Sequence, residues 1–271
     1  MPANLRIFGR LAGLLAWTLP CALIQAILLL LPGRPKENFA RFYWRGIRRI
    51  FGMRITVIGA VSVERPVLFV VNHSSWLDII ALGSVLPGCF VAKGEIAGWP
   101  VFNIIARLGR TVFVSRSKTG VKRERSDMLA RLQEGDNLIL FPEGTTSDGS
   151  RILRFQSAFL AVAQGNAAPF IQPVTLVYDR MNGLPVRKRD RPILSWYGAM
   201  DLVSHFPGIA RLGSFHATLV LDAAIPPAAF ANRKTLSAML ESRLAANAAA
   251  LRQGRNVTPL AALPNPAGIA P

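Results

Sequence analysis

The chain has 271 residues, a formal net charge of +17 at pH 7 and 51% hydrophobic residues. So large a charge calls for an anionic partner, which is a nucleic acid, an anionic membrane surface or an acidic substrate. The hydrophobic residues are concentrated near the N-terminus, which excludes an ordinary soluble nucleic-acid binder. The two cysteines, Cys21 and Cys89, stand too far apart for a disulfide framework or a Cys-x-x-Cys zinc site.

The N-terminal segment is predicted to be a membrane anchor. Residues 11–31 carry no charged side chain and are numerous enough to cross a bilayer core, although Pro20 and Gln25 interrupt the apolar run. The segment is therefore expected to span the membrane or to re-enter it. A cleavable signal peptide is the alternative, because Arg6 and Arg10 form a charged start, but no clear small-residue cleavage site follows.

The next segment, residues 34–54, predicts a basic amphipathic helix. It carries seven Lys and Arg and one acid, Glu37. Its apolar residues fall near one helical face, namely Phe39, Tyr43, Ile47, Ile50 and Phe51. Such a helix suits the headgroup layer, where each cation contributes roughly 1 kcal/mol near an anionic surface. The alternative is an amphipathic helix docked on the domain, and one helix can serve both roles. The excess of positive charge predicts that the domain after this helix lies on the cytoplasmic face.

From residue 55 onward, short apolar runs alternate with helical stretches, which is typical of α/β structure. The predicted strands are 66–71, 88–92, 111–114, 137–141, 171–177, 193–197 and 217–221, and the predicted helices are 76–86, 121–134, 157–165 and 235–251. We expect one catalytic domain, residues 55–250, with a mixed, largely parallel sheet flanked by helices. An anchor, residues 1–54, precedes it and a loose tail, 251–271, follows.

A general base is indicated where the first of these strands ends. His73 and Asp78 stand five residues apart, and five residues along an ideal helix leave their side chains roughly 140° apart. They pair only if His73 lies in the loop before a helix and Asp78 lies in its first turn. Asn72 to Ser75 supply capping-type residues for such a start. The carboxylate would then fix one imidazole nitrogen as N–H and leave the other to take a proton from a hydroxyl.

Two further segments offer ligand contacts. Gly109 opens a strand that Arg116 closes, which can present a guanidinium to phosphate, or simply a surface cation. After the strand 137–141, the residues Pro142-Glu143-Gly144-Thr145-Thr146 combine a carboxylate, hydroxyls and a glycine that permits a tight turn. An ordinary strand-ending turn is the alternative.

In this order, the motifs resemble those of the glycerolipid acyltransferase family typified by bacterial 1-acylglycerol-3-phosphate acyltransferases. They are N-H-x4-D from Asn72 to Asp78, G-x3-F-x2-R from Gly109 to Arg116, F-P-E-G-T from Phe141 to Thr145, and the strand containing Pro173. The resemblance covers roughly residues 55–225, and it is specific because the first and third motifs seldom occur together by chance.

The resemblance implies acyl transfer from acyl-CoA or acyl carrier protein to the free hydroxyl of a lysolipid. His73 would take the hydroxyl proton and Asp78 would orient His73. Acceptor binding would involve Arg116, Glu143, Gly144, Thr145 and Thr146, together with Gly109 and the nearby Lys93. No metal and no cofactor beyond the acyl donor are expected, and the membrane surface is the expected partner rather than nucleic acid.

The residue after F-P-E-G-T departs from the family pattern. Many members carry Arg at this position, whereas this chain has Thr146, so one cation for an acceptor phosphate is missing. Related bacterial enzymes acylate lyso-ornithine lipid, whose headgroup has no phosphate. Lysophosphatidic acid is placed first because Arg116 and Lys93 can still bind phosphate, and lyso-ornithine lipid is the alternative acceptor.

The remaining histidines are assigned structural roles. His205 lies in a stretch, 200–206, that predicts a loop or a helix turn, and His216 lies inside an apolar strand as a packed core residue. The rival function is a non-catalytic, basic membrane-binding protein that uses the same N-terminal helices. A nucleic-acid binder is disfavoured by the apolar N-terminus.

Overall fold

The computed structural model describes residues 3–94, 98, 100–114, 120–164, 168–226, 229–230 and 232–261. Its strands form one sheet in the order β1-β8-β6-β2-β5-β3-β4, with β7 paired to β6. The strands are β1 (Met53–Gly59), β2 (Val67–Val71), β3 (Cys89–Lys93), β4 (Val112–Val114), β5 (Leu138–Leu140), β6 (Phe170–Met181), β7 (Leu184–Pro185) and β8 (Phe215–Leu221). Most neighbours are parallel, but β8 runs antiparallel to β6. The predicted mixed, largely parallel sheet is confirmed.

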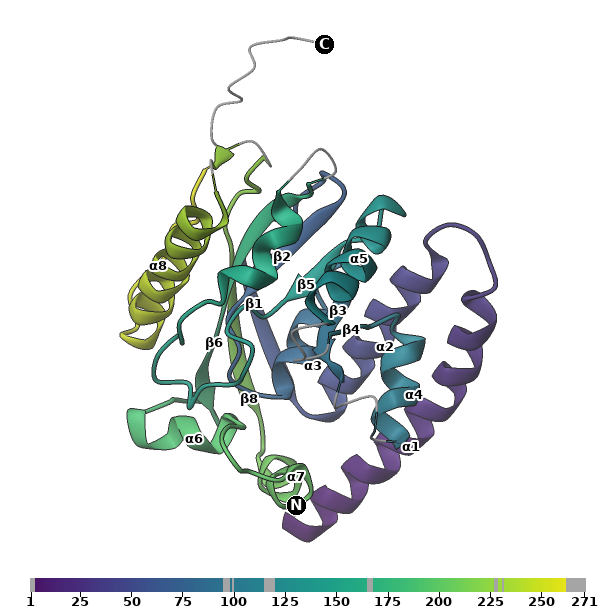
Figure 1. Cartoon of the computed structure of the whole chain (residues 1–271). Helices are drawn as coiled ribbons and strands as arrows, with labels where there is room; N and C mark the ends of the chain where they lie inside the picture. Colours follow the sequence, from purple (N-terminus) through teal and green to yellow (C-terminus); the bar gives the residue numbers. More distant parts are fainter. Residues whose placement is uncertain are drawn as a thin grey trace.

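Helices cover both faces of the sheet. They are α1 (Ala3–Leu28), α2 (Pro35–Ile50), α3 (Leu77–Gly83), α4 (Pro100–Leu108), α5 (Gly120–Gln133), α6 (Arg191–Leu194), α7 (Leu202–Arg211) and α8 (Arg233–Arg252), with 3₁₀ segments η2 (Ser157–Ala163) and η3 (Lys188–Asp190). The helix α8 and the pair α1 and α2 lie on opposite sides of the sheet (Figure 1). Parallel strands need such cover because they bury both faces.

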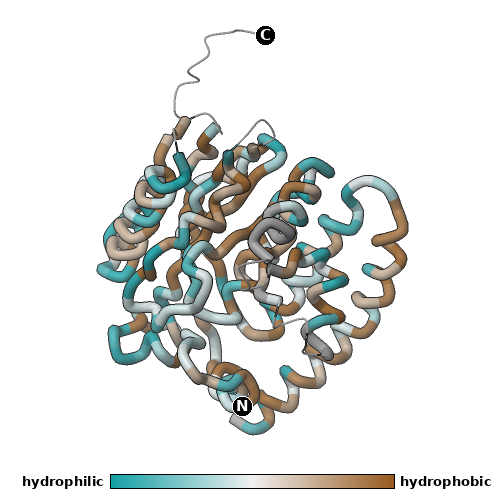
Figure 2. The backbone as a smooth tube through the Cα atoms, in the orientation of Figure 1, coloured by the Kyte–Doolittle hydropathy of each residue, from teal (hydrophilic) through white to brown (hydrophobic). Residues whose placement is uncertain are grey.

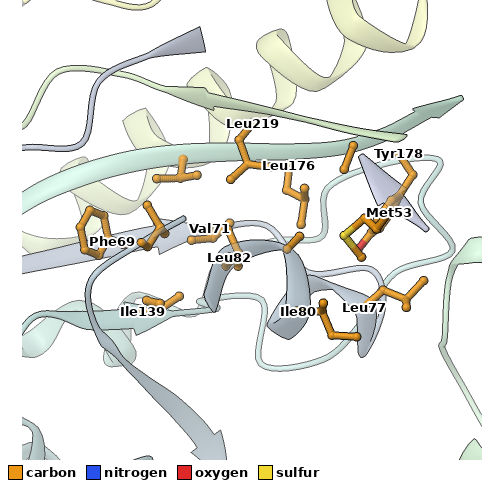
Figure 3. Close-up of a cluster of buried hydrophobic side chains, with 14 of the residues drawn as sticks. Met53, Phe69, Val71, Leu77, Ile80, Leu82, Ile139, Leu176, Tyr178 and Leu219 are labelled. Atoms are coloured by element: carbon orange, nitrogen blue, oxygen red, sulfur yellow. The ribbon is translucent and has the colours of Figure 1, made fainter. Parts of the chain in front are cut away.

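The central strand β2 shows why this sequence forms a buried sheet. All five of its residues, Val-Leu-Phe-Val-Val, are 0% exposed. Phe69 and Val71 pack with α3 and α7 on one face, whereas Leu68 and Val70 pack with α5, η2 and α8 on the other. Figure 3 shows the first cluster, in which Leu77 of α3 lies near the end of the strands. This packing fixes the start of α3 beside the end of β2.

The N-terminal helix α1 is docked on the domain. The guanidinium of Arg10 is buried and donates to the carbonyl oxygens of Ile50, Ile209, Ala210 and Gly213 at 3.0–3.2 Å. Four acceptors satisfy a cation that would otherwise be costly to bury. The helix is also long and apolar enough to cross a membrane by length and composition. Figure 2 shows the apolar residues along α1.

Helices α1 and α2 approach closely at Gly46. A Cβ atom at this position would lie 2.1 Å from the Trp17 ring, so only glycine admits the indole there. The indole N–H of Trp17 donates to the Tyr43 carbonyl oxygen at 3.0 Å. Ile47 of α2 is 3% exposed and belongs to the core. The basic helix is therefore docked on the domain, which was one of its two predicted roles.

Several predicted elements are corrected. The segment 193–197 is not a strand: Pro192 lies in the first turn of α6, and Trp196 beyond it donates its amide N–H to Ser74 O at 2.8 Å. The segment 157–165 is a 3₁₀ helix, Ser157–Ala163, rather than an α-helix. The strand β1 was missed because its residues directly follow the basic segment and contain Arg54.

The division of the chain into three units stays a prediction, but the structure shows contacts across both of its boundaries. The boundary after residue 54 falls inside β1, which pairs along its whole length with β8. The tail expected to be loose from residue 251 is held as far as Leu260, whose amide N–H donates to Asp222 at 2.7 Å. In addition, Arg243 of α8 donates to the Thr258 carbonyl oxygen at 2.9 Å. Residues 262–271 lie outside the described part of the chain.

Candidate active site

The predicted His73 and Asp78 pair is formed with the required geometry. The helix α3 begins at Leu77, so His73 lies in the loop before the helix and Asp78 in its first turn. The Nδ1 atom of His73 lies 2.8 Å from Asp78 Oδ2. The roles of the two residues in catalysis stay predictions, but the contact that those roles require is present.

The Asp78 carboxylate organises the whole loop. It is 0% exposed, and its Oδ2 also accepts hydrogen bonds from the backbone N–H groups of Ser74 and Ser75 at 2.7 and 3.0 Å. Its Oδ1 accepts from the Tyr178 hydroxyl at 2.7 Å. Four donors hold this carboxylate, so it can only orient His73, and it does not face an incoming substrate.

The imidazole of His73 is held on its face as well as at its edge. It stacks on the Phe141 ring with centroids 3.9 Å apart and an interplanar angle of 15°. Because Nδ1 is bound to Asp78, Nε2 is the nitrogen that remains. Within the described residues Nε2 makes no hydrogen bond, and the His73 side chain is 18% exposed. The ring is therefore oriented to accept a proton at Nε2.

The F-P-E-G-T turn holds the backbone of the loop that carries His73. Glu143 Oε1 accepts from the His73 amide N–H at 2.7 Å, and Oε2 accepts from the Leu153 amide N–H at 2.7 Å. The Ser147 amide N–H donates to the His73 carbonyl oxygen at 3.0 Å. Burial raises the pKa of Glu143 to about 7, although the two amide donors oppose the shift. Glu143 is 3% exposed, and the structure gives it a positioning contact rather than a substrate contact.

The other motif residues shape the turn after Glu143. Gly144 has φ +65°, a backbone conformation that favours glycine, and a Cβ there would lie 2.5 Å from Gln156 Nε2 and would displace that amide. Thr145 is exposed and Thr146 is half-buried, so their hydroxyls are the ones that a ligand can reach.

The remaining predicted site residues are not brought to His73 by any described contact. Gly109 follows α4 and lines a small pocket with Cys21 and Gln25 of α1. Lys93 ends β3, but its side chain lies outside the described part of the chain, as does Arg116 entirely. The described part also holds no group of three or more His, Cys, Asp or Glu suited to a metal ion.

Sequence reasoning missed two residues that support the pair. Tyr178 follows directly after the predicted strand 171–177; because β6 and β2 are parallel neighbours, their ends converge on the same loop. Asn72 was taken as a capping residue, but its side chain pairs with the backbone of Leu176 through two hydrogen bonds of 2.9 and 2.8 Å. The available signal was a polar residue directly after β2 and another directly after the predicted strand 171–177.

Two cations lie beside the loop that follows Thr146. A Cβ on Gly149 would lie 3.7 Å from Arg191 Cβ, and Arg252 donates to the Ser150 carbonyl oxygen at 3.0 Å. Burial, followed by repulsion from Arg191, lowers the pKa of Arg252 to about 10, whereas Asp148 opposes this shift. The loop therefore presents cations and a carboxylate close together.

The other two histidines serve different surroundings. His205 lies in α7, as the expected helix turn allowed, and its Nδ1 accepts from the Trp76 indole N–H at 3.0 Å. His216 is not a packed core residue: it is half-buried, on the sheet face opposite the core of α3, and it contacts Asp179 and Thr56. Alternation along β8 places its odd-numbered neighbours in the core instead.

Comparisons with known proteins agree with this geometry. The family model "Acyltransferase" matches residues 54–177. A lyso-ornithine lipid O-acyltransferase from Brucella abortus is 36% identical over 95% of this chain and 99% of its own length. A 1-acyl-sn-glycerol-3-phosphate acyltransferase from Neisseria gonorrhoeae is 36% identical over 45% of this chain and 49% of its own length.

The fold is also that of a solved structure. The crystal structure of a 1-acyl-sn-glycerophosphate acyltransferase from Thermotoga maritima superposes with a TM-score of 0.61, covering 92% of this chain and 100% of that chain at 19% identity. The resemblance in motifs, the family match and the extended identity to the Brucella protein lead to one conclusion. The chain belongs to the acyltransferase family.

Proposed function

We propose that this protein is a lyso-ornithine lipid O-acyltransferase, which moves a fatty acyl group from a thioester donor to the hydroxyl of lyso-ornithine lipid. One observation carries the choice of acceptor. The similarity to the Brucella enzyme of that name extends over 95% of the chain, whereas the similarity to the Neisseria enzyme that acts on 1-acylglycerol-3-phosphate stops at 45%. The alternative acceptor of the sequence prediction is thus preferred to lysophosphatidic acid.

The proposed base is His73 Nε2. Asp78 keeps the proton of the neutral ring on Nδ1, so Nε2 has a free lone pair for the acceptor hydroxyl. When the ring takes that proton, it becomes a cation 2.8 Å from a carboxylate that carries no other positive partner among the described contacts. General-base help of this kind typically contributes about 10²- to 10⁴-fold in rate.

The transfer itself needs no acyl-enzyme. As Nε2 removes the hydroxyl proton, the oxygen attacks the thioester carbonyl and forms a tetrahedral intermediate. This collapses with cleavage of the carbon–sulfur bond, giving the new oxygen ester. The proton on His73 then passes to the leaving thiolate, which departs as the free thiol of CoA or of acyl carrier protein. The base is thereby restored.

The loop after Thr145 supports a phosphate-free, zwitterionic headgroup. Ornithine brings an ammonium and a carboxylate, and this loop offers the Asp148 carboxylate beside Arg191 and Arg252. An Arg in place of Thr146 would add a cation suited to phosphate. The threonine leaves Asp148 without that competing charge, which favours an acceptor that brings its own ammonium.

The proposed attachment is to one surface of the membrane. The exposed apolar residues of α1 recur every three or four positions along one face, at Leu5, Phe8, Leu11, Leu15, Leu19, Leu23 and Ile27. The buried Arg10 anchors the same helix to the domain on another face. A helix held along its length in this way lies in the cytoplasmic leaflet rather than crossing the bilayer. Labelling of single cysteines at the exposed polar residues Asn4 and Arg34 tests this: both should react from the cytoplasmic side, and reaction from opposite sides contradicts it.

The acceptor is tested with purified protein and radiolabelled acyl-CoA or acyl carrier protein. Lyso-ornithine lipid and 1-acylglycerol-3-phosphate are offered separately and in competition. We expect the ornithine acceptor to be preferred at least about tenfold in kcat/KM, roughly the discrimination that one charge-assisted contact supplies. Product from 1-acylglycerol-3-phosphate alone would overturn the choice of acceptor, and product from neither would overturn the lysolipid activity.

Two variants separate the catalytic step from the choice of acceptor. His73→Ala should abolish transfer to every acceptor while thermal unfolding still shows a folded protein. Thr146→Arg should keep transfer but shift the preference toward 1-acylglycerol-3-phosphate. Thr145→Ser serves as the neighbouring control, because it keeps a hydroxyl and the charge of the loop. An unchanged preference in Thr146→Arg would show that this loop does not contact the headgroup.

A further inference from the structure

A cavity lined mainly by polar residues lies on the sheet away from the candidate active site. It has a volume of about 410 Å³ and is formed where β1, β8 and β6 run side by side. Tyr178 of β6 reaches Asp78, whereas the next residue, Asp179, lines the cavity. The cavity is therefore at the same end of the sheet as His73 but on the opposite face, and acyl transfer does not use it.

A bulge in β6 builds one side of this cavity. The pairing of β6 with β8 shifts register between Tyr178 and Arg180, so the extra residue is Asp179. In a regular strand, Asp179 and Arg180 would point to opposite faces, but both line the cavity. The bulge thus delivers a carboxylate and a guanidinium to one place while Tyr178 keeps its contact with Asp78.

The carboxylate is fully occupied by its neighbours. Asp179 Oδ1 lies 2.5 Å from His216 Nδ1, and Oδ2 accepts from the Thr218 hydroxyl at 2.8 Å. The other imidazole nitrogen, Nε2, lies 2.9 Å from the Thr56 hydroxyl. Although burial alone would raise it, hydrogen bonds from His216 and Thr218 lower the pKa of Asp179. The carboxylate therefore stays charged and fixes the direction of His216.

Two guanidinium groups in the cavity are not balanced by acids. Arg54 of β1 and Arg180 of β6 are exposed and line the cavity on either side of β8. Among the ion pairs of the described residues neither appears, and the one carboxylate in the cavity, Asp179, pairs with His216. Two convergent cations beside hydroxyl groups are the usual means of binding a phosphate group.

We propose that this cavity is a second binding site, which takes a phosphate group through Arg54 and Arg180, with the hydroxyl group of Ser214 as a further donor. The acceptor proposed above has no phosphate, so this ligand is a different molecule. Its source is a soluble phosphate compound or the headgroup of an anionic phospholipid. The rim is tied to the membrane-facing helix, since Gly213, next to Ser214, binds Arg10 of α1.

The test uses the full-length protein in detergent and one pair of double variants. Arg54→Gln with Arg180→Gln removes both cavity cations. Arg233→Gln with Lys234→Gln removes two exposed cations at the start of α8 and gives the same change in net charge. Because all four side chains are exposed, both variants should fold, which thermal unfolding checks. Inorganic phosphate is titrated while the imidazole ¹⁵N signals of His216 are followed, and co-sedimentation is measured with vesicles of phosphatidylcholine with and without phosphatidylglycerol.

We expect the cavity variant to lose at least about tenfold in affinity relative to the control, as one charge-assisted contact or more is removed. A loss for inorganic phosphate identifies soluble phosphate as sufficient. A loss seen only with phosphatidylglycerol vesicles identifies the lipid headgroup. Equal affinities in both variants for both probes would overturn the proposal, since general surface charge would then explain the binding. None of these readouts requires acyl transfer, so the proposal can fail or hold independently of the proposed function.

Discussion

Replacing Asp78 by Asn isolates the charge that the site places behind His73. The amide oxygen can occupy the place of Oδ2 and accept from His73, Ser74 and Ser75, while the amide N–H₂ donates to the Tyr178 oxygen. The hydrogen-bond geometry and the tautomer of His73 are therefore retained. The Tyr178 hydroxyl loses the acceptor of its own proton. The main loss at His73 is the negative charge, which matters once His73 has taken the proton.

The size of the effect follows from the separation of the charges. Two unit charges at about 4 Å interact by about 4 kcal/mol at an effective dielectric constant of about 20. The Nδ1 to Oδ2 distance is 2.8 Å and Asp78 is 0% exposed, so solvent screens this pair little. A loss of roughly 3–4 kcal/mol in the transition state corresponds to about 10²- to 10³-fold in kcat. KM should change little, because Asp78 has no surface for a substrate to contact.

The assay is steady-state acyl transfer in detergent, with kcat and KM measured separately and the fold checked by thermal unfolding. Tyr178→Phe is the matched control, since it removes one of the four donors to Asp78 but keeps the charge. We expect it to lower kcat by about tenfold or less, the value of one hydrogen bond. A folded Asp78→Asn protein that retains more than about a third of the wild-type kcat would refute the role assigned to this carboxylate.

Three further outcomes are expected. Burial raises the pKa of Glu143 to about 7, so the folded state binds more protons than the unfolded chain between about pH 4.5 and 7. The free energy of unfolding should therefore fall as pH rises through this window, by at most roughly 3 kcal/mol. Glu143→Gln should flatten that part of a curve of Tm against pH. Gly144→Ala should lower the free energy of unfolding by about 1 kcal/mol or more beyond Gly135→Ala, because both have positive φ but only Gly144 is crowded; equal losses would contradict this. Arg10→Met should lower the free energy of unfolding by about 3–5 kcal/mol, measured by chemical denaturation. Arg6→Met, which loses one exposed hydrogen bond, should lower it by less than about 1 kcal/mol. Similar losses in the two variants would mean that Arg10 does not hold α1.

Much of the sheet was predictable because its strands are short apolar runs buried on both faces. β2 and β5 were placed within about a residue for this reason, and the motifs that follow them were placed beside each other correctly. The same criterion failed at 193–197, where an apolar run lies against the domain without joining the sheet. It also failed for β1, an edge strand whose outer residues are polar or exposed. Pairing with a neighbouring strand, rather than the apolar pattern itself, decides these cases.

The reacting pair of the site could be predicted from the sequence, whereas the residues that hold this pair in place could not. The geometric condition on His73 and Asp78 could be stated from their spacing, and the structure meets it. The contact with Tyr178 could not be stated, because it depends on which strands are neighbours. The pairing of His216 with Asp179 was hidden for a similar reason, because it depends on β6 and β8 being antiparallel neighbours.

The two acids of the motifs, Asp78 and Glu143, are both unavailable for contact with an acceptor headgroup. Asp78 and Glu143 are buried, and every carboxylate oxygen on them accepts from the protein itself. Both acids therefore hold His73 in place and neither is free to read a headgroup. Discrimination between lysolipids must then come from groups that remain accessible, and after Glu143 these begin at Thr145 and Thr146. A family can keep its motif acids while changing its acceptor, and the proposed function predicts that such a change acts through Thr146.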